Sequence, residues 1–365
     1  MTETDRQSAN SGTKAPDAAL SLPEGRLSAW FEHYVQGFEG PLSTSQFKGG
    51  QSNPTYLLTT PAKRYVLRRK PPGPLLPSAH AVEREFRVMQ ALGLQGFPVP
   101  KVYGLCEDET VIGSVFFVME HIDGRIIWEP FIPDATPADR TAIFDAMNMV
   151  MAQLHTLDPY ENGLGDYGRP SDYLKRQVSR WTRQYRASET ETIPAMEMLI
   201  EWLPDNLPQE QPARLVHGDF RLDNLILAPD ENRVAAVLDW ELSTLGDPIA
   251  DFTYHCMQWV MPRTPDGSGI GTLAGHDLTQ MGIPSLVDYV ERYEARTGYT
   301  VHEHLDFYFA FNFFRLAAIL QGIAGRLRDG TATSGHARSM ASQTGAIAET
   351  GRYFAEQPNK QASNL

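Results

Sequence analysis

The chain has 365 residues, 42% of them hydrophobic and 21% charged, with a formal net charge of −13. This is a globular composition, long enough for two lobes, and its acidity argues against nucleic acid or membrane surfaces as general partners. The two cysteines, Cys106 and Cys256, suggest neither a disulfide framework nor a zinc motif, which fits the reducing cytoplasm.

Residues 1–26 lack an apolar signal core and are rich in small polar residues, which predicts a disordered tail. Residues 27–122 are predicted to form an N-terminal lobe. A helix opens it at 27–38, and strand patterns follow in "FKGGQSNPTYLLTT", "KRYVLRRK", "KVYGLCED" and "SVFFVMEHI". A helical period begins at His80, so we expect a small antiparallel sheet with one inserted helix.

Residues 123–356 are mostly helical in pattern, and 357–365 are expected to be a second tail. Thr136, Pro137 and Asp139 form a capping-box signature at the start of one helix, and Asp247 followed by Pro248 predicts an N-cap at the start of another. The apolar run from Phe307 carries interrupting polar residues, which favours a buried helix over a membrane span. A sheet lobe followed by a helical lobe indicates the α+β class.

One polar cluster interrupts the helical part, in "LVHGDFRLDNLILAPDENRVAAVLDWE". Two short apolar strands flank a turn, so a hairpin is expected to bring Asp219 and Asn224 near Asp239. Carboxylate and amide oxygens suit a hard cation such as Mg²⁺, and an aspartate that is not on the metal can act as a base. The hairpin therefore predicts metal-assisted chemistry.

The spacing His-x-Asp, then Asn five residues later, then Asp after the next strand is the layout of phosphoryl-transfer enzymes. The segments "HGDFRLDN", "VLDWE" and "GDPIADF" resemble the aminoglycoside phosphotransferase/choline kinase-like family. The resemblance covers about residues 40–330. Within that family, "LRRKPPGPLLPSAHAVEREFRVM" is most similar to the branch associated with acyl-CoA dehydrogenases. The resemblance implies a protein-kinase-like fold of two lobes.

The resemblance also implies roles for the residues of this motif. Asp219 would be the catalytic base, and Asn224 and Asp239 would hold Mg²⁺. His217 is expected to brace the loop by hydrogen bonds. Arg221 is either a contact of the γ-phosphate or a solvated loop residue. Two further aspartates, Asp223 and Asp251, are expected to brace the loop, and the role of Glu241 stays open between a brace and metal binding.

A second group of residues would bind the nucleotide phosphates. A Gly-rich turn supplies Gly49, Gly50, Ser52 and Asn53 as candidate phosphate donors, although ordinary turn chemistry explains the same residues. Strand alternation places Arg68 with Lys70 on one face, and the resemblance selects Arg68 where related kinases have Lys.

The partner and the base-binding strand follow from the resemblance as well. It favours Glu85 over Glu83 as the helix carboxylate that holds Arg68. It also implies that the backbone from Glu120 to Ile122 hydrogen-bonds an adenine edge, with Met119 as apolar lining.

The expected activity is transfer of a phosphoryl group from ATP, or alternatively GTP, to a hydroxyl group of a small molecule with Mg²⁺. The branch resemblance suggests a hydroxyacyl-CoA acceptor and a functional link to an acyl-CoA dehydrogenase. Choline or aminoglycoside acceptors are alternatives. So is a pseudokinase module, which Arg68 alone supports, and a metal-dependent hydrolase, for which no further ligand motif is present. Arg176, Arg180 and Arg183 recur at helical spacing and fit either a coenzyme A contact or a solvated helix face.

Overall fold

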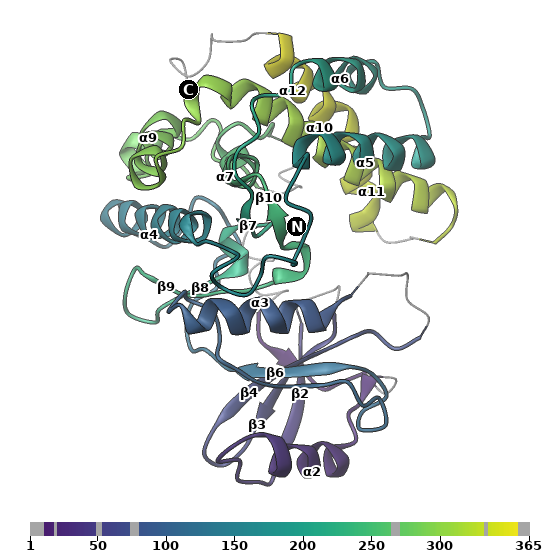
Figure 1. Ribbon diagram of the computed structural model, residues 1–365, viewed down its shortest axis with the longest axis vertical. Coiled ribbons are helices and arrows are strands. Elements are labelled where there is room, and N and C mark those ends of the chain that lie inside the picture. The colour runs from purple at the N-terminus through teal and green to yellow at the C-terminus, as the bar shows by residue number, and fades with distance from the viewer. Residues whose placement is uncertain are drawn as a thin grey trace. The chain divides into compact units, whose positions relative to one another are not determined.

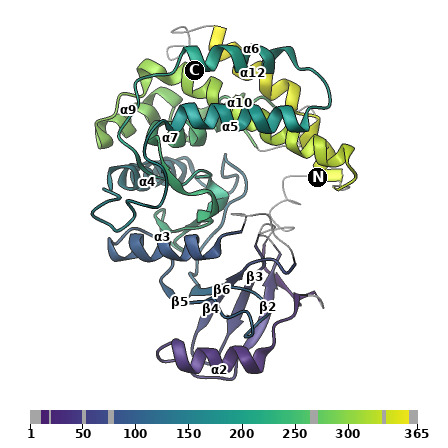
Figure 2. The ribbon, with the colours of Figure 1, turned by 45° about the vertical axis from the view of Figure 1, so that its right-hand side comes forward.

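The computed structural model describes residues 11–17, 20–48, 53–73, 80–263, 271–331 and 335–356. Contacts within the chain divide it into two compact units, drawn in Figures 1 and 2. Unit 1 comprises Met1–Trp128, Asn162–Leu164 and Leu222–Ser243. Unit 2 comprises Glu129–Glu161, Gly165–Arg221 and Thr244–Leu365. The chain therefore passes between the units several times.

Unit 1 is built on an antiparallel sheet whose strands run in the order β1-β2-β3-β4-β6-β5. These are β1 (Thr13–Lys14), β2 (Ser43–Phe47), β3 (Thr55–Thr59), β4 (Arg64–Arg69), β5 (Val102–Cys106) and β6 (Phe116–Glu120). Helices α2 (Glu24–Tyr34) and α3 (Val82–Leu94) lie on opposite faces of the sheet (Figure 1). Alternate residues of each strand therefore pack against one helix or the other.

The face toward α2 carries the aromatic core of unit 1. Trp30 and Phe31 of α2 pack edge-on against Phe116 and Tyr65 of the sheet, with ring centroids 5.0 Å and 5.4 Å apart. The opposite face, toward α3, receives Arg68 of β4, because its neighbour Leu67 belongs to the α2 core. Strand alternation thus turns the Arg68 side chain toward the helix that carries Glu85.

Two details at the N-terminus differ from the sequence expectation. Within the expected tail, Thr13 and Lys14 pair with β2, and α2 begins at Glu24 and ends at Tyr34. Leu22 is buried in the same core as Leu27, so the chain is anchored before the expected start of the lobe. Both helices expected in this lobe are present, and only the bounds of the first one differ. Gly49, Gly50 and Ser52 lie outside the described residues.

A hairpin of β8 (Leu225–Leu227) and β9 (Val234–Val237) belongs to unit 1, although the sequence assigned it to the helical lobe. The amide of Val237 donates to the carbonyl of Pro98 at 2.8 Å, and Trp240 packs edge-on against Phe97. Arg125 forms a bridge with Leu227. These contacts fix the hairpin beside the segments that follow α3 and β6.

Unit 2 is largely helical, and its described residues include one short strand pair of β7 (Arg214–Val216) and β10 (Thr244–Gly246). Its helices are α4 (Pro137–Thr156), α5 (Tyr173–Ser188), α6 (Pro194–Asp205), α7 (Pro248–Cys256), α8 (Leu278–Met281), α9 (Leu286–Thr297), α10 (Leu305–Arg328), α11 (Gly335–Ala341) and α12 (Thr344–Glu356). The predicted capping box of α4 is confirmed. The α+β class is confirmed as well.

Helix α10 is the central element of unit 2. By length and composition the span His302–Arg328 is apolar enough to cross a membrane, but 78% of its most apolar window is buried inside the protein. It packs against α5, α6, α7 and α12. Its apolar character is therefore that of a core helix, as the sequence predicted.

Candidate functional site

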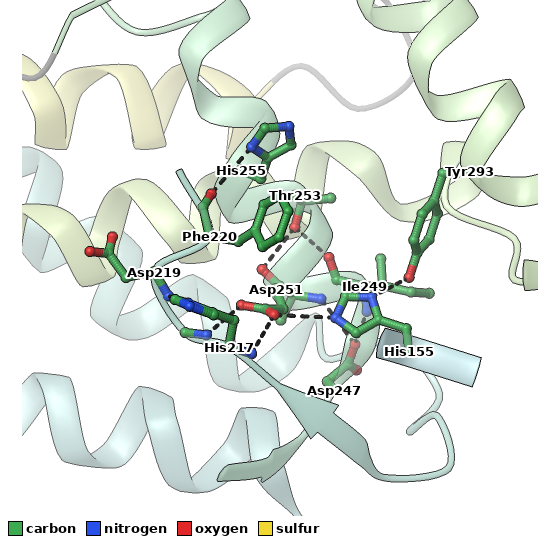
Figure 3. A network of polar contacts seen from close by, with 12 residues as sticks. His155, His217, Asp219, Phe220, Asp247, Ile249, Asp251, Thr253, His255 and Tyr293 are labelled. Atoms are coloured by element: carbon green, nitrogen blue, oxygen red, sulfur yellow. Dashed lines mark hydrogen bonds and ion pairs between the residues drawn. The ribbon is translucent and has the colours of Figure 1, made fainter. Parts of the chain in front are cut away.

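The loop that carries Asp219 follows β7 and is held by a buried carboxylate. Asp251 of α7 accepts hydrogen bonds from the backbone amides of His217 at 2.7 Å and Gly218 at 2.8 Å (Figure 3). Gly218 has φ = 85°, a left-handed conformation that glycine adopts without strain. Two consecutive amides on one carboxylate fix the course of the backbone immediately before Asp219.

Asp251 is itself held in place by a contact with His155 of α4. Nε2 of His155 lies 3.2 Å from the Asp251 carboxylate, and Nδ1 lies 2.6 Å from the Tyr293 hydroxyl. Burial alone would raise the pKa of Asp251. The hydrogen bond and charge of His155, together with His217, outweigh burial and lower the pKa overall. Asp251 is thus a buried anion with its partners in place.

The position of Asp251 depends on how α7 begins. Asp247 caps the helix by accepting from the amides of Ile249 at 2.8 Å and Ala250 at 3.0 Å. The Tyr308 hydroxyl donates to the second oxygen of Asp247 at 3.0 Å. The predicted N-cap role of Asp247, with Pro248 at the first helical position, is confirmed.

Asp219 itself is only partly buried. Its amide donates to Nδ1 of His217 at 3.2 Å, so that nitrogen acts as an acceptor and the ring braces the loop. The Tyr254 hydroxyl faces Asp219. Burial, and then the negative charge of Asp219, raise the pKa of Tyr254. Arg315 donates to the Gly218 carbonyl at 2.8 Å, which adds a second clamp on the loop.

In unit 1, Arg68 is surrounded by three carboxylates. Nε of Arg68 lies 3.0 Å from Glu85, and Nη2 lies 2.6 Å from Asp239 and 3.4 Å from Glu241. The sequence favoured Glu85 over Glu83 as the helix carboxylate for Arg68, and this ion pair is present. Glu83 instead pairs with Lys70 at 2.9 Å. The guanidinium fork engages all three carboxylates together, which a single ammonium does not match.

The charge of this cluster is unbalanced. The pKa of Glu85 is raised to about 8. Burial is the largest cause, Arg68 opposes it, and the negative charges of Asp239 and Glu241 add to it. One cation among three carboxylates leaves an excess of negative charge. The cluster is therefore electrostatically suited to receive a further cation.

Asn53 was expected to supply a phosphate donor, but the structure engages both ends of its side chain with protein groups. The residue is fully buried. Nδ2 donates to Glu85 at 3.2 Å and to Glu241 at 3.4 Å, and Oδ1 lies 3.0 Å from Nδ1 of His80. Asn53 thus links the ends of the carboxylate cluster around Arg68.

The β8–β9 hairpin brings Asn224 next to Asp239 within unit 1. The carbonyl of Asn224 accepts from the amide of Leu238 at 2.8 Å, so the residues that flank the two strands lie side by side. Asp239 adopts φ = 62°, a left-handed conformation that is uncommon for a residue with a side chain. Asp219 belongs to unit 2, on the other side of the boundary at Arg221. The positive charge of Arg221 lowers the pKa of Tyr254, against the larger effects of burial and of Asp219.

The expected adenine-binding strand is β6. Met119 is buried and pairs with Val66 of β4, on the same face as Arg68. The amide of Glu120 donates to the carbonyl of Lys101 at 2.8 Å and is therefore committed within the sheet. Binding of an adenine edge by the backbone from Glu120 to Ile122 stays a prediction.

Several residues that build these arrangements were not found from the sequence. His155, Tyr254 and Arg315 all hold the Asp219 loop or face Asp219. The available signal was an ionisable residue within an otherwise apolar helix, as with Arg315 in α10. That signal shows that a polar partner exists but does not identify it.

An antiparallel sheet unit with an Arg–Glu pair, and a helical unit with a braced His-Gly-Asp loop, define a kinase-like phosphotransferase. The chain belongs to the phosphotransferase enzyme family, whose model matches residues 43–298. It is therefore an enzyme of the small-molecule kinase class, and the kinase-like fold predicted from the resemblance is confirmed.

Two curated relatives are acyl-CoA dehydrogenase family members. Family member 10 of Mus musculus is 46% identical over 351 residues, which cover 94% of this chain and 32% of that protein. Family member 11 of Homo sapiens is 41% identical over 350 residues, covering 93% of this chain and 44% of that protein. The chain thus spans less than half the length of these relatives.

Solved structures show the same fold. A putative aminoglycoside phosphotransferase from Ralstonia eutropha is 49% identical with a TM-score of 0.85, covering 92% of this chain and 99% of that one. Two distant structures share the fold alone. One is an aminoglycoside phosphotransferase with ADP and hygromycin B, 15% identical over 90% of this chain and 97% of that one, with a TM-score of 0.56. The other is an aminoglycoside 2'-phosphotransferase with GDP, 12% identical over 91% of this chain and 99% of that one, with a TM-score of 0.57.

Proposed function

We propose that this enzyme transfers the γ-phosphoryl group of ATP to a hydroxyl group of a small molecule, with Asp219 as the base. The observation that carries the proposal is the clamp of Asp251 on the amides of His217 and Gly218. It holds a partly exposed carboxylate in one place, which a base needs if it is to meet an incoming hydroxyl group. A distant relative in fold holds GDP, so GTP is the alternative donor.

In this proposal the acceptor oxygen forms a bond to the γ-phosphorus, and the bond to the bridging oxygen of the leaving ADP breaks. The acceptor proton passes to Asp219. The Tyr254 hydroxyl and the Arg315 clamp orient that carboxylate and its loop. In unit 1, Arg68 would bind the nucleotide phosphates while Glu85 keeps its guanidinium in place.

The donor set in unit 1 fits Mg²⁺. Asn224 and Asp239 are adjacent across the hairpin and offer an amide oxygen and a carboxylate, next to a cluster with excess negative charge. Among the described residues, no group of three His, Cys, Asp or Glu side chains is placed to hold a metal. Mg²⁺ sites commonly use one or two protein ligands together with water and substrate phosphates. Bound there, the ion would neutralise charge on the phosphates.

For the acceptor, we propose the hydroxyl group of a hydroxyacyl-CoA. Support comes from the relatives named as acyl-CoA dehydrogenase family members, which match this chain over nearly its whole length. A functional link to a dehydrogenase that acts on the same acyl-CoA pool follows from this proposal. Choline and aminoglycosides are the alternative acceptors.

The test is acceptor-dependent release of ADP with Mg²⁺ and ATP, using hydroxyacyl-CoA esters, choline, simple sugars and aminoglycosides as acceptors. Asp219→Asn should reduce kcat by at least about 10²-fold while Mg-nucleotide binding stays within about twofold. Asp230→Asn, at an exposed position in the turn of the β8–β9 hairpin, is the matched control and should keep most of the activity. Unchanged turnover in Asp219→Asn would refute the assigned base.

The second candidate is a nucleotide-binding module without turnover, which the Arg in place of Lys at position 68 favours. It predicts binding of Mg-ATP with no acceptor-dependent ADP release in the wild-type enzyme. The intact set of Asp219, Asn224 and Asp239 supports the catalytic proposal over this one.

A further inference from the structure

Helix α5 of unit 2 carries an unusual concentration of positive charge. Its sixteen residues, "YLKRQVSRWTRQYRAS", include five Lys or Arg and no carboxylate. The whole chain has a net charge of −13, so this helix contrasts with the rest of the protein. A local positive patch on an acidic protein points to a bound anion, because the general surface repels anions.

The outer face of α5 is hollowed into a pocket of about 400 Å³, within the usual range of small-molecule sites. Four cations and a single carboxylate line it together with one serine: Arg169, Asp172, Lys175, Arg176, Ser179 and Arg183. In the described part of the chain, none of the four cations forms an ion pair with a carboxylate. This differs from Arg186 on the same helix, which is neutralised by Glu197 at 2.5 Å.

One group in this pocket lacks a partner that its chemistry requires. Nη2 of Arg176 donates to the carbonyl of Arg169 at 2.8 Å, whereas Nη1 is buried and meets no acceptor among the described residues. A buried charged donor without an acceptor is unfavourable by several times the ordinary net value of a hydrogen bond. An anionic oxygen in the pocket would satisfy it, and a guanidinium binds phosphate oxygens in a bidentate manner.

The positive charge continues from the pocket to the catalytic loop. Arg180 lies one turn from Arg176 and stacks on the ring of Trp181 at 5.2 Å. Arg315 lies 5.8 Å from the same ring and clamps the Gly218 carbonyl. A single acceptor that extends along this path would reach from the pocket toward Asp219.

We propose that the pocket on α5 binds the phosphate groups of the acceptor, so that the enzyme selects small molecules carrying a hydroxyl group at one end and clustered phosphates at the other. This deepens the proposed function and rests on it. It also disfavours polycationic acceptors, which the cations of α5 would repel.

The test uses coenzyme A and pantetheine, which share the pantetheine portion and differ in the phosphates and nucleoside. Protein saturated with Mg²⁺ and a non-hydrolysable ATP analogue is titrated with each by calorimetry. We expect coenzyme A to bind at least tenfold more tightly than pantetheine, with an affinity that falls as salt rises. Inorganic tripolyphosphate should compete with coenzyme A.

Arg176→Gln/Arg183→Gln should weaken coenzyme A binding at least tenfold, and Arg186→Gln, the matched control on the same helix, should change it less than twofold. Because Arg176 is half-buried, Lys175→Gln/Arg183→Gln is the second variant, which changes exposed residues only. With an active acceptor, both double variants should raise KM for the phosphate-bearing acceptor and leave kcat nearly unchanged.

The proposal is overturned if pantetheine binds as tightly as coenzyme A, or if both double variants bind coenzyme A like the wild-type enzyme. It is also overturned if the variants lose binding to anionic vesicles or to an oligonucleotide while coenzyme A binding is unaffected. The binding measurement needs no turnover. A failed acceptor screen therefore tests the proposed function separately, and Asp219→Asn tests the base whatever occupies the pocket.

Discussion

Asp251→Asn tests whether the buried carboxylate holds the catalytic loop. The asparagine keeps one oxygen for one amide, but its NH₂ group faces the other amide or His155, which removes the charge and leaves a buried donor unpaired. A hydrogen bond to a charged group contributes about 1.5–3 kcal/mol, and breaking a buried ionic pair costs about 3–5 kcal/mol. Since Asp251 is only 4% exposed, solvent compensates little, and we expect a loss of about 3 kcal/mol in the free energy of unfolding.

The free energy of unfolding is measured by urea denaturation near neutral pH. The values of kcat and of KM for ATP are measured on the same variants. A small displacement of the loop should lower kcat by about 10²-fold, whereas KM for ATP should change little because Arg68 and Glu85 are in unit 1. Asp134→Asn, at an exposed position before α4, is the matched control and should stay within about 0.5 kcal/mol of wild type. If Asp251→Asn equals this control in both stability and kcat, the clamp does not hold the loop.

Three further changes test other parts of the structure. Arg68→Lys leaves a single nitrogen to contact three carboxylates. The free energy of unfolding in urea should fall by about 2 kcal/mol, and KM for ATP should rise. Wild-type values would contradict the need for a guanidinium group at this position. Burial lowers the pKa of His255 from 6.5 to about 4, so the stability it confers is complete above pH 6.5 and is lost as pH falls toward 4. The free energy of unfolding from urea titrations should drop by up to about 3 kcal/mol over that window, and His255→Gln should flatten the profile. In Gly124→Ala the new Cβ collides with a backbone carbonyl of β8, which should lower the free energy of unfolding by at least about 2 kcal/mol. Gly25→Ala in α2 is the control, because its Cβ meets nothing within 4 Å and the change should be neutral or stabilising. Equal melting temperatures of the two variants would contradict this packing.

The sequence predicted those features that depend on local periodicity. Alternation in "RYVLRRK" was enough to separate Arg68 from Arg69, and the structure has Arg68 on Glu85 while Arg69 bonds Ser114 at 2.8 Å. Capping chemistry at Thr136 and Asp247 was readable because each cap involves residues within a few positions of one another. Such signals need no knowledge of distant partners.

The rest depended on contacts between distant parts of the chain. His155 reaches Asp251 across 96 positions, and Arg315 reaches Gly218 across 97, so no local pattern identifies either pair. Strand β1 has only two residues and depends on β2 for its pairing, which made it indistinguishable from a polar tail. Whether Asp219 acts as the base, and Asn224 and Asp239 as metal ligands, stays a prediction.

The boundary between the two units falls between Arg221 and Leu222, inside the segment "HGDFRLDN". A fragment cut at this boundary would keep either Asp219 or the pair Asn224 and Asp239, but never all three. Exchange of whole units between related enzymes would therefore have to preserve five crossings of the chain as well as the fold of each unit. If the proposed residues carry the chemistry, the two units have to be inherited and exchanged together for the enzyme to keep its activity.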